Sequence, residues 1–196
     1  MEFNDIYDND RNLTGRVHKR GTPWKKNEFG LVVCVWVYND QGQLLLTRRA
    51  PEKSFAGTWE NSGGAAKAGE TSRKAIAREL FEETGIQAEE EEFLLLETGR
   101  NRNCHYDFYC IHRNIPVEDI VLLPGETDDV KWATYEEIHQ MIADKCAGCV
   151  GNRCRYARIL HFFHHCFDRQ CQQIGIVPVF KHFRIHRRVA FIVWYA

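Results

Sequence analysis

The chain has 196 residues, and its 26 Lys and Arg side chains nearly balance 27 Asp and Glu side chains. Hydrophobic residues make up 44% of the chain, which is enough to build a core and excludes disorder throughout. No run of about 18 uncharged apolar residues occurs, so we expect no membrane span. The acidic segment MEFNDIYDND is unlike a secretory leader, and a cytoplasmic protein is the simplest expectation.

Predicted elements begin with a polar lead-in over residues 1–27, in which Gly15, Gly21 and Pro23 favour short strands or a loose segment. The β-branched and aromatic residues 31–38 predict a strand. Turn residues follow at 39–42, and a returning strand is predicted at 43–48.

A long glycine-bearing segment covers residues 50–70 and includes a short predicted strand near 59–62. Thr71 is placed to cap a helix over residues 72–84, and Gly85 is placed to end it. Further elements are predicted as strands at 93–97, 104–112 and 130–133 and a closing helix at 135–143. Because strands and helices mix without regular alternation, the sequence favours an α+β fold.

Residues 145–196 differ in composition from the rest of the chain. They carry nine of the 26 basic side chains, one of the 27 acidic ones and five of the eight cysteines. We therefore divide the chain into a lead-in (1–27), a domain (28–144) and a basic, Cys/His-rich C-terminal tail (145–196) of uncertain structure.

Three carboxylates share one face of the predicted helix. At 100° per residue, Glu79, Glu82 and Glu83 lie within a stripe about 100° wide. Like charges at this spacing destabilise a helix by a few tenths of a kcal/mol each, roughly, unless something compensates. A hard divalent cation is the functional interpretation, and a solvated acidic face is the alternative.

The residues around this stripe favour the functional interpretation. A glycine-rich loop containing Gly63, Gly64 and Gly69 precedes the helix, and its backbone can approach a phosphate or a metal closely. Arg78 adjoins the carboxylates and can orient one of them through paired hydrogen bonds.

The segment from residue 64 to 86 resembles the Nudix box, G-x5-E-x7-R-E-U-x-E-E-x-G-U, where U is apolar. Every specified position matches, at Gly64, Glu70, Arg78, Glu79, Leu80, Glu82, Glu83, Gly85 and Ile86. The resemblance covers about residues 5–144. It implies an α/β/α sandwich with a mixed sheet and Mg²⁺- or Mn²⁺-dependent cleavage of a diphosphate linked to another moiety.

The resemblance also assigns roles to residues. It implies Glu79, Glu82 and Glu83 as metal ligands, with the Gly63 carbonyl as an addition, while Arg78 and Glu70 brace the box. The general base is either a box glutamate or a residue outside the box. Our outside candidate is Glu126, for which an exposed loop acid is the alternative, and Asp107 is a candidate extra ligand.

The upstream segments LLLTRRAPEK and GTWENS resemble the isopentenyl-diphosphate isomerase branch of this superfamily. That resemblance implies that Arg49 and Lys53 hold the substrate diphosphate; a basic solubilising loop is the alternative. Trp59 is a candidate substrate contact or a core residue. The sequence departs from the branch because no cysteine follows Ser62 closely and no histidine stands at residues 30–31, so we favour hydrolysis over isomerisation.

Ligands for Zn²⁺ are abundant in the tail, at Cys146, Cys149, Cys154, His161, His164, His165, Cys166 and Cys171. Their spacing matches no zinc-finger pattern. The alternatives to a zinc site are a helical extension, a basic surface for nucleic acid or a protein partner, and a sequence read from a shifted frame. We expect neither disulfides nor a nucleic-acid partner.

The leading prediction is a divalent-metal-dependent hydrolase acting on a small nucleotide- or isoprenoid-type diphosphate. An isopentenyl-diphosphate isomerase-like enzyme and a non-catalytic nucleotide-binding module are the alternatives. Substrate specificity is expected to come from loops at 50–58 and 98–104. The oligomeric state is left open.

Overall fold

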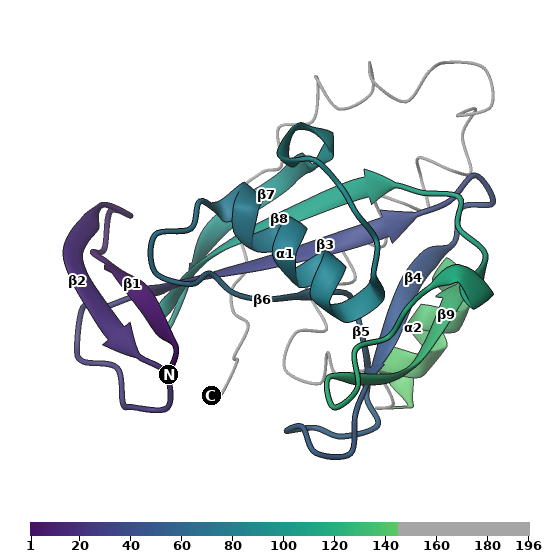
Figure 1. Cartoon of the computed structure of the whole chain (residues 1–196), viewed down its shortest axis with the longest axis horizontal. Helices are drawn as coiled ribbons and strands as arrows, with labels where there is room; N and C mark the ends of the chain where they lie inside the picture. The colour runs from purple at the N-terminus through teal and green to yellow at the C-terminus, as the bar shows by residue number, and fades with distance from the viewer. Residues whose placement is uncertain (145–196) are drawn as a thin grey trace.

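The computed structural model describes residues 1–144, in which a two-stranded hairpin lies beside a seven-stranded sheet with a helix on each face (Figure 1). The tail, with its candidate zinc ligands, lies outside the described residues. The strands are β1 (Phe3–Tyr7), β2 (Leu13–Lys19), β3 (Gly30–Tyr38), β4 (Leu44–Arg49), β5 (Trp59–Glu60), β6 (Gly63–Ala65), β7 (Leu94–Asn101), β8 (Cys104–His112) and β9 (Thr127–Ala133). The helices are α1 (Ser72–Thr84) and α2 (Tyr135–Ala143), with 3₁₀ turns at Glu90–Glu92 and Val117–Asp119.

Strand β3 organises the sheet. It runs parallel to β8 from the Gly30–Cys104 pair to the Tyr38–His112 pair, whereas the other pairings in the sheet are antiparallel. On its other edge, β3 pairs with β6 near its beginning and with β4 at its end. The short strand β6 therefore brings the glycine-rich segment directly alongside the central strand.

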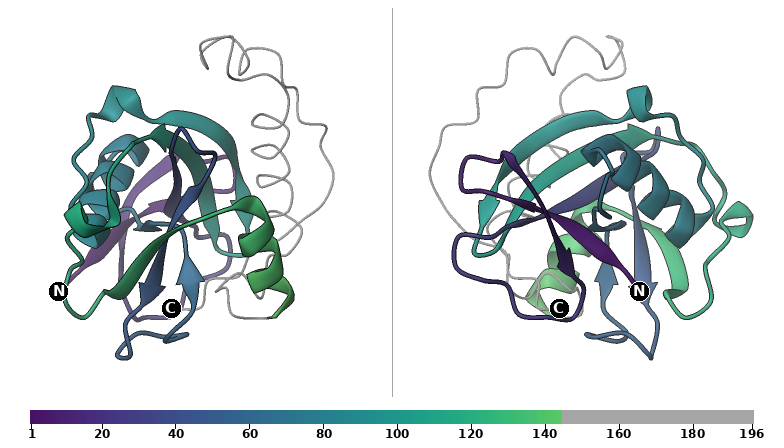
Figure 2. Two further views of the ribbon diagram at one scale, coloured as in Figure 1. Left: turned by 90° about the vertical axis from the view of Figure 1, so that its right-hand side faces the viewer. Right: turned by 60° about the vertical axis from the view of Figure 1, so that its left-hand side comes forward.

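Alternation along β3 builds two separate cores. Val33 and Val35 face one side of the sheet, where they belong to the same buried cluster as Leu80 of α1. Trp36 faces the other side and shares a cluster with Ile138 of α2. Each face is thus covered by one helix, as two views of the ribbon show (Figure 2), and the predicted α/β/α sandwich with a mixed sheet is confirmed.

Helix α1 begins and ends where the sequence predicts. The Thr71 hydroxyl accepts a hydrogen bond from the Lys74 backbone N–H, and Gly85 ends the helix in the left-handed conformation with φ 69°. Ile76 and Leu80, four residues apart, are fully buried. Glu83 lies one turn further along the same side, so the packing of the apolar stripe carries this carboxylate inward.

Of two predictions about irregular segments, one needs correction. Residues 98–104 are not a loop, because β7 pairs with β8 as far as Asn101–Cys104 and leaves only a tight turn, where Asn103 and Cys104 line the cavity described below. The lead-in contains the ordered hairpin β1–β2, one of the two states predicted for it. Its exposed, polar β2 lacks the apolar alternation that marks a strand in a sequence.

Asp107 is also placed differently from the prediction. This buried carboxylate on β8 accepts hydrogen bonds from both terminal nitrogens of Arg11, at 2.8 and 2.5 Å, and from the Ser72 hydroxyl at the start of α1. Burial raises its pKa, but these hydrogen bonds outweigh burial and hold the pKa below its ordinary value. Asp107 therefore joins the hairpin to the sheet, and its carboxylate is engaged by Arg11 and Ser72.

Replacing Arg11 with methionine is expected to lower the free energy of unfolding by about 2 kcal/mol at pH 7, because it leaves a buried carboxylate without its cation. Asp107 has a lowered pKa, so its stabilising effect is complete above about pH 4 and is lost as the pH falls. Urea unfolding at pH 7 and pH 3 should therefore show that the free energies of unfolding of wild type and Arg11→Met differ less at pH 3 than at pH 7. A double variant that also carries Asp107→Asn should recover part of the loss; a fully additive loss contradicts the pairing.

Within the described residues, no helix is long and apolar enough to cross a bilayer.

Candidate active site

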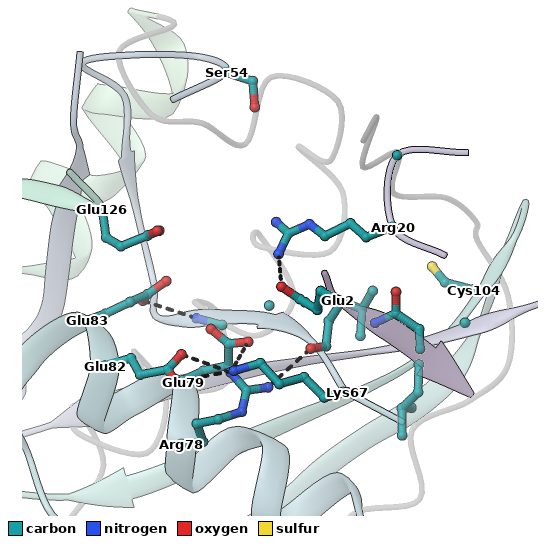
Figure 3. A pocket seen from close by; sticks show the side chains of 18 of the residues that line it. Glu2, Arg20, Ser54, Lys67, Arg78, Glu79, Glu82, Glu83, Cys104 and Glu126 are labelled. Carbon is teal, nitrogen blue, oxygen red and sulfur yellow. Dashed lines mark hydrogen bonds and ion pairs between the residues drawn. The ribbon is translucent and has the colours of Figure 1, made fainter. Parts of the chain in front are cut away.

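A cavity of about 500 Å³ lies between α1, β6, the beginning of β3 and the N-terminal hairpin. Figure 3 shows charged side chains from these elements and from Glu126 facing a common space. Eight of the predicted site residues line it, namely Arg49, Lys53, Gly63, Arg78, Glu79, Glu82, Glu83 and Glu126. Residues up to 77 positions apart in the chain therefore meet at one cavity.

Arg78 holds the box together. Its Nε and Nη2 donate to the two carboxylate oxygens of Glu70 at 2.7 and 2.9 Å, the paired geometry expected of a brace. Its Nη1 donates to Glu79 at 2.8 Å and to Glu82 at 2.9 Å. One guanidinium thus fixes three carboxylates, and a second cation, Lys67, lies 3.3 Å from Glu82.

The inner carboxylates are poorly solvated. Burial raises the pKa of Glu83 well above its usual value, and the nearby charges of Glu60 and Glu79 raise it further. The Gly63 N–H donates to Glu83 at 3.3 Å and opposes this effect. Burial also raises the pKa of Glu79, against the lowering effect of Arg78. A further positive charge beside these side chains would stabilise their ionised forms.

Close packing surrounds Gly63 and Gly64, the two glycines of β6. A Cβ added at Gly64 would lie 2.5 Å from a carboxylate oxygen of Glu79, and one at Gly63 would lie 2.3 Å from the Val33 carbonyl oxygen. Glu79 therefore occupies the space that a side chain at residue 64 would need. The glycines of the box let the carboxylates approach the backbone of β6.

The donor set suits a hard divalent cation, since Glu79, Glu82 and Glu83 offer carboxylate oxygens on one cavity wall. In residues 1–144, no three acidic, histidine or cysteine side chains already converge as a preformed metal cluster. Glu79 and Glu82 are instead both paired with Arg78. The residues thus fit Mg²⁺ or Mn²⁺ by chemistry and position, while Arg78 provides part of the compensating charge.

Arg49 and Lys53 reach the cavity already paired. Arg49 donates to Glu60 at 2.6 Å and to the Ser54 carbonyl at 2.7 Å, and Lys53 forms an ion pair with Glu126. The predicted diphosphate contacts and the predicted base are thus neighbours. Both cations have acidic partners that an incoming phosphate can replace.

Glu60 is a site residue that the sequence analysis missed. Its side chain is 13% exposed beside Arg49, and burial raises its pKa while Arg49 lowers it. The charge of Glu60 also raises the pKa of Glu83. The only sequence signal is its place between Trp59 and Asn61 in a two-residue strand, which does not reveal the direction of the side chain.

Trp59 does not line the cavity. Its ring lies near the positive groups of Arg48, at 5.7 Å, and Lys131, at 4.5 Å, and it packs against the core on the α2 side of the sheet. Strand β5 directs the tryptophan to the face opposite the box helix. The predicted substrate contact is therefore corrected to the alternative, a packing residue.

Comparisons with known proteins show the family to which the chain belongs. The NUDIX domain family matches residues 28–148. An uncharacterized Nudix hydrolase of Listeria monocytogenes is 32% identical over 148 residues, which cover 72% of this chain and 85% of that protein. An isopentenyl-diphosphate Delta-isomerase of an Enterobacter strain is 37% identical, but over 38% of this chain and 42% of its own length.

A solved structure, DR0079 from Deinococcus radiodurans, aligns with a TM-score of 0.65 and 22% identity over 85% of this chain and 99% of its own, which supports the fold. The intact box, the sandwich fold and the match over residues 28–148 lead to one conclusion: the chain belongs to the Nudix family and is a Nudix hydrolase.

Proposed function

We propose that this protein is a divalent-metal-dependent hydrolase that cleaves a diphosphate linkage in a small nucleotide- or isoprenoid-type substrate. The observation that carries the proposal is the pairing of two groups of side chains around one cavity. Glu79, Glu82 and Glu83 of α1 line the cavity together with Arg49, at the end of β4, and Lys53, in the segment that follows it. Carboxylates suit a metal, and basic side chains suit phosphate oxygens.

In the proposed mechanism, Glu79, Glu82 and Glu83 would hold Mg²⁺ or Mn²⁺, with the Gly63 carbonyl as a further donor. A bound ion supplies neutralisation of the phosphate charge and a more acidic water. Arg49 and Lys53 bind the diphosphate oxygens. Arg78 and Glu70 keep the carboxylates in place and touch no reacting atom.

Proton transfer is assigned to Glu126. Its carboxylate is paired with Lys53, and a diphosphate that takes over Lys53 releases it to accept a proton from water. A box glutamate is the alternative base.

Isomerisation is the less favoured activity. The isomerase branch places a cysteine soon after the W-x-N-S motif, but residues 63 and 64 are glycines here. A side chain at Gly63 would collide with the backbone of β3, and one at Gly64 would collide with Glu79. A cysteine at residue 63 would therefore require the backbone of β3 or β6 to move, and one at residue 64 would require the Glu79 carboxylate to move.

The test is a panel of nucleoside diphosphate derivatives and isoprenoid diphosphates, assayed with increasing Mg²⁺ or Mn²⁺ and again after chelation. We expect turnover of at least one member, loss of that turnover on chelation, and recovery when metal is restored. Proton exchange into dimethylallyl diphosphate is measured in parallel and should be absent. Tight binding of a panel member without any metal-dependent turnover would instead support a non-catalytic module.

A further inference from the structure

Arg49 and Glu60 form a nearly buried ion pair at the edge of the cavity. Their side chains are 12% and 13% exposed, and the Arg49 Nη1 donates to a Glu60 carboxylate oxygen at 2.6 Å. Arg49 lines the cavity, whereas Glu60 does not. Glu60 therefore reaches the cavity only through the cation that it holds.

The sheet brings these two side chains together. Glu60 ends β5 and is paired with Thr47, two residues before Arg49 at the end of β4. Side chains of paired residues lie on one face about 5 Å apart, within reach of a long side chain two positions further on. The chain between the strands closes on itself, because the Arg49 N–H donates to the Thr58 carbonyl at 3.0 Å and the Gly57 N–H donates to the Arg49 carbonyl at 2.9 Å.

The Arg49 side chain is held from two directions. Its Nε donates to the Ser54 carbonyl at 2.7 Å, and its Nη1 donates to Glu60. A guanidinium is planar, so two bonded nitrogens set both its plane and its direction. Glu60 accepts from one of its five N–H groups, which does not prevent the same cation from donating to a phosphate oxygen. An arginine held in this way loses less side-chain freedom when a ligand binds.

A phosphate can replace either acidic partner of the two cations, but the replacements differ in cost. Lys53 pairs with Glu126, whose side chain is 42% exposed, so water can solvate this carboxylate after its release. Within residues 1–144, by contrast, Arg49 is the side chain that hydrogen-bonds to the nearly buried Glu60. Displacing Glu60 would leave a poorly solvated carboxylate without its cation. A phosphate is therefore expected to take Lys53 from Glu126 and to share Arg49 with Glu60.

We propose that Glu60 is a positioning residue for the reaction: its carboxylate holds the Arg49 guanidinium at the cavity and keeps this contact when the diphosphate is bound. It touches neither the substrate nor the metal ion. This inference rests on the proposed function, because it takes Arg49 to bind diphosphate oxygens. The two acidic partners then have opposite effects on an anion, since Glu60 supports its binding and Glu126 competes with it for Lys53.

The direction of the change in affinity separates this role from a simple charge effect. Removing a carboxylate near a bound diphosphate makes the site more positive and, by charge alone, tightens the binding of an anion. A positioning role predicts the opposite result at Glu60, because the arginine loses its fixed direction. The measurement is calorimetric titration of the whole protein with methylenediphosphonate in the presence of Mg²⁺, a probe that cannot be hydrolysed.

We expect Glu60→Met to weaken binding of this probe about tenfold. Glu60→Gln keeps an oxygen that can accept from Arg49, so it should weaken binding less, and it carries the test if methionine prevents folding. Glu126→Gln removes the competitor for Lys53 and should tighten binding about twofold.

Glu28 provides the matched control. Its side chain is 8% exposed and forms an ion pair with Arg16, but neither residue lines the cavity. Glu28→Met should therefore lower the free energy of unfolding and leave the Kd for the probe within about twofold of wild type. A loss of affinity that appears at Glu60 and not at Glu28 is not a general effect of breaking a buried ion pair.

Dependence on Arg49 is tested by a double variant. Once Arg49 is replaced, Glu60 has no cation to position, so Arg49→Met and Arg49→Met/Glu60→Met should bind the probe with Kd values within about twofold of each other. Titration with Mn²⁺ alone should give Glu60→Met a Kd within about twofold of wild type, because Glu60 is not a metal ligand.

Three results would overturn the inference and leave the proposed function standing. They are probe binding that is unchanged or tighter in both Glu60 variants, an equal loss from Glu60→Met with and without Arg49, and weaker Mn²⁺ binding in Glu60→Met. A wild-type protein that does not bind methylenediphosphonate would instead remove the diphosphate contact at Arg49, and the inference with it.

Discussion

The Glu82→Gln variant is expected to fold normally and to lose at least about 100-fold in kcat/KM. Replacing a residue that only hydrogen-bonds to a metal ligand already lowers activity by about 10–100-fold, and we expect a larger loss when a ligand itself is replaced. Glu82 is the best box position for this test. Its side chain is 39% exposed, whereas Glu83 is buried and its replacement changes packing as well as charge. Glutamine keeps the size of the side chain and removes the charge that a divalent cation needs.

Two measurements make this result specific to the site. The free energy of unfolding of Glu82→Gln should lie within about 0.5 kcal/mol of wild type, as for an ordinary surface change. Glu91→Gln, an exposed glutamate outside the cavity, is the matched control and should keep full activity. Equal turnover in Glu82→Gln and Glu91→Gln would show that the box carboxylates do not support the reaction.

Replacing Arg78 with lysine is expected to affect both folding and activity. Arg78 is 18% exposed and donates to Glu70, Glu79, Glu82 and the Ala65 carbonyl, whereas an ammonium group cannot reproduce the paired contact with Glu70. We expect about 2 kcal/mol of lost stability, because the ammonium group of lysine cannot make all the hydrogen bonds that the guanidinium donates to these partly buried carboxylates and to the Ala65 carbonyl. We expect about 10–100-fold lower kcat, as for a residue that orients metal ligands.

Arg102→Lys is the matched control, since Arg102 is exposed and lies outside the cavity. A positioning role also predicts that Arg78→Lys needs more Mg²⁺ for half-maximal activity than wild type does. An unchanged metal requirement together with normal kcat would contradict the role of Arg78 as a brace for the carboxylates.

Local patterns in the sequence predict the helix and its carboxylates well. The 3.6-residue period puts Glu79, Glu82 and Glu83 on one side, and Thr71 and Gly85 mark the ends of the helix at the observed residues. The contact between Arg78 and Glu70 depends on a close approach of neighbouring segments, and the box resemblance implies it. In each of these cases, the information lies within about 20 residues of sequence.

Contacts between distant segments could not be predicted in this way. The pairing of Arg49 with Glu60 and of Asp107 with Arg11 depends on which strand edge faces which segment. The position of Trp59 depends on the face to which a two-residue strand directs it, and a strand this short has no readable alternation. The contribution of Trp24 to the cavity comes from a hairpin that docks far from the box in sequence.

The most direct test of the account is an anomalous difference map from crystals of the wild-type protein grown with Mn²⁺. The account predicts a manganese peak beside the carboxylates of Glu79, Glu82 and Glu83, and the loss of that peak in crystals of Glu82→Gln. A wild-type map without a peak at these side chains, in a protein that is active with Mn²⁺, would contradict it.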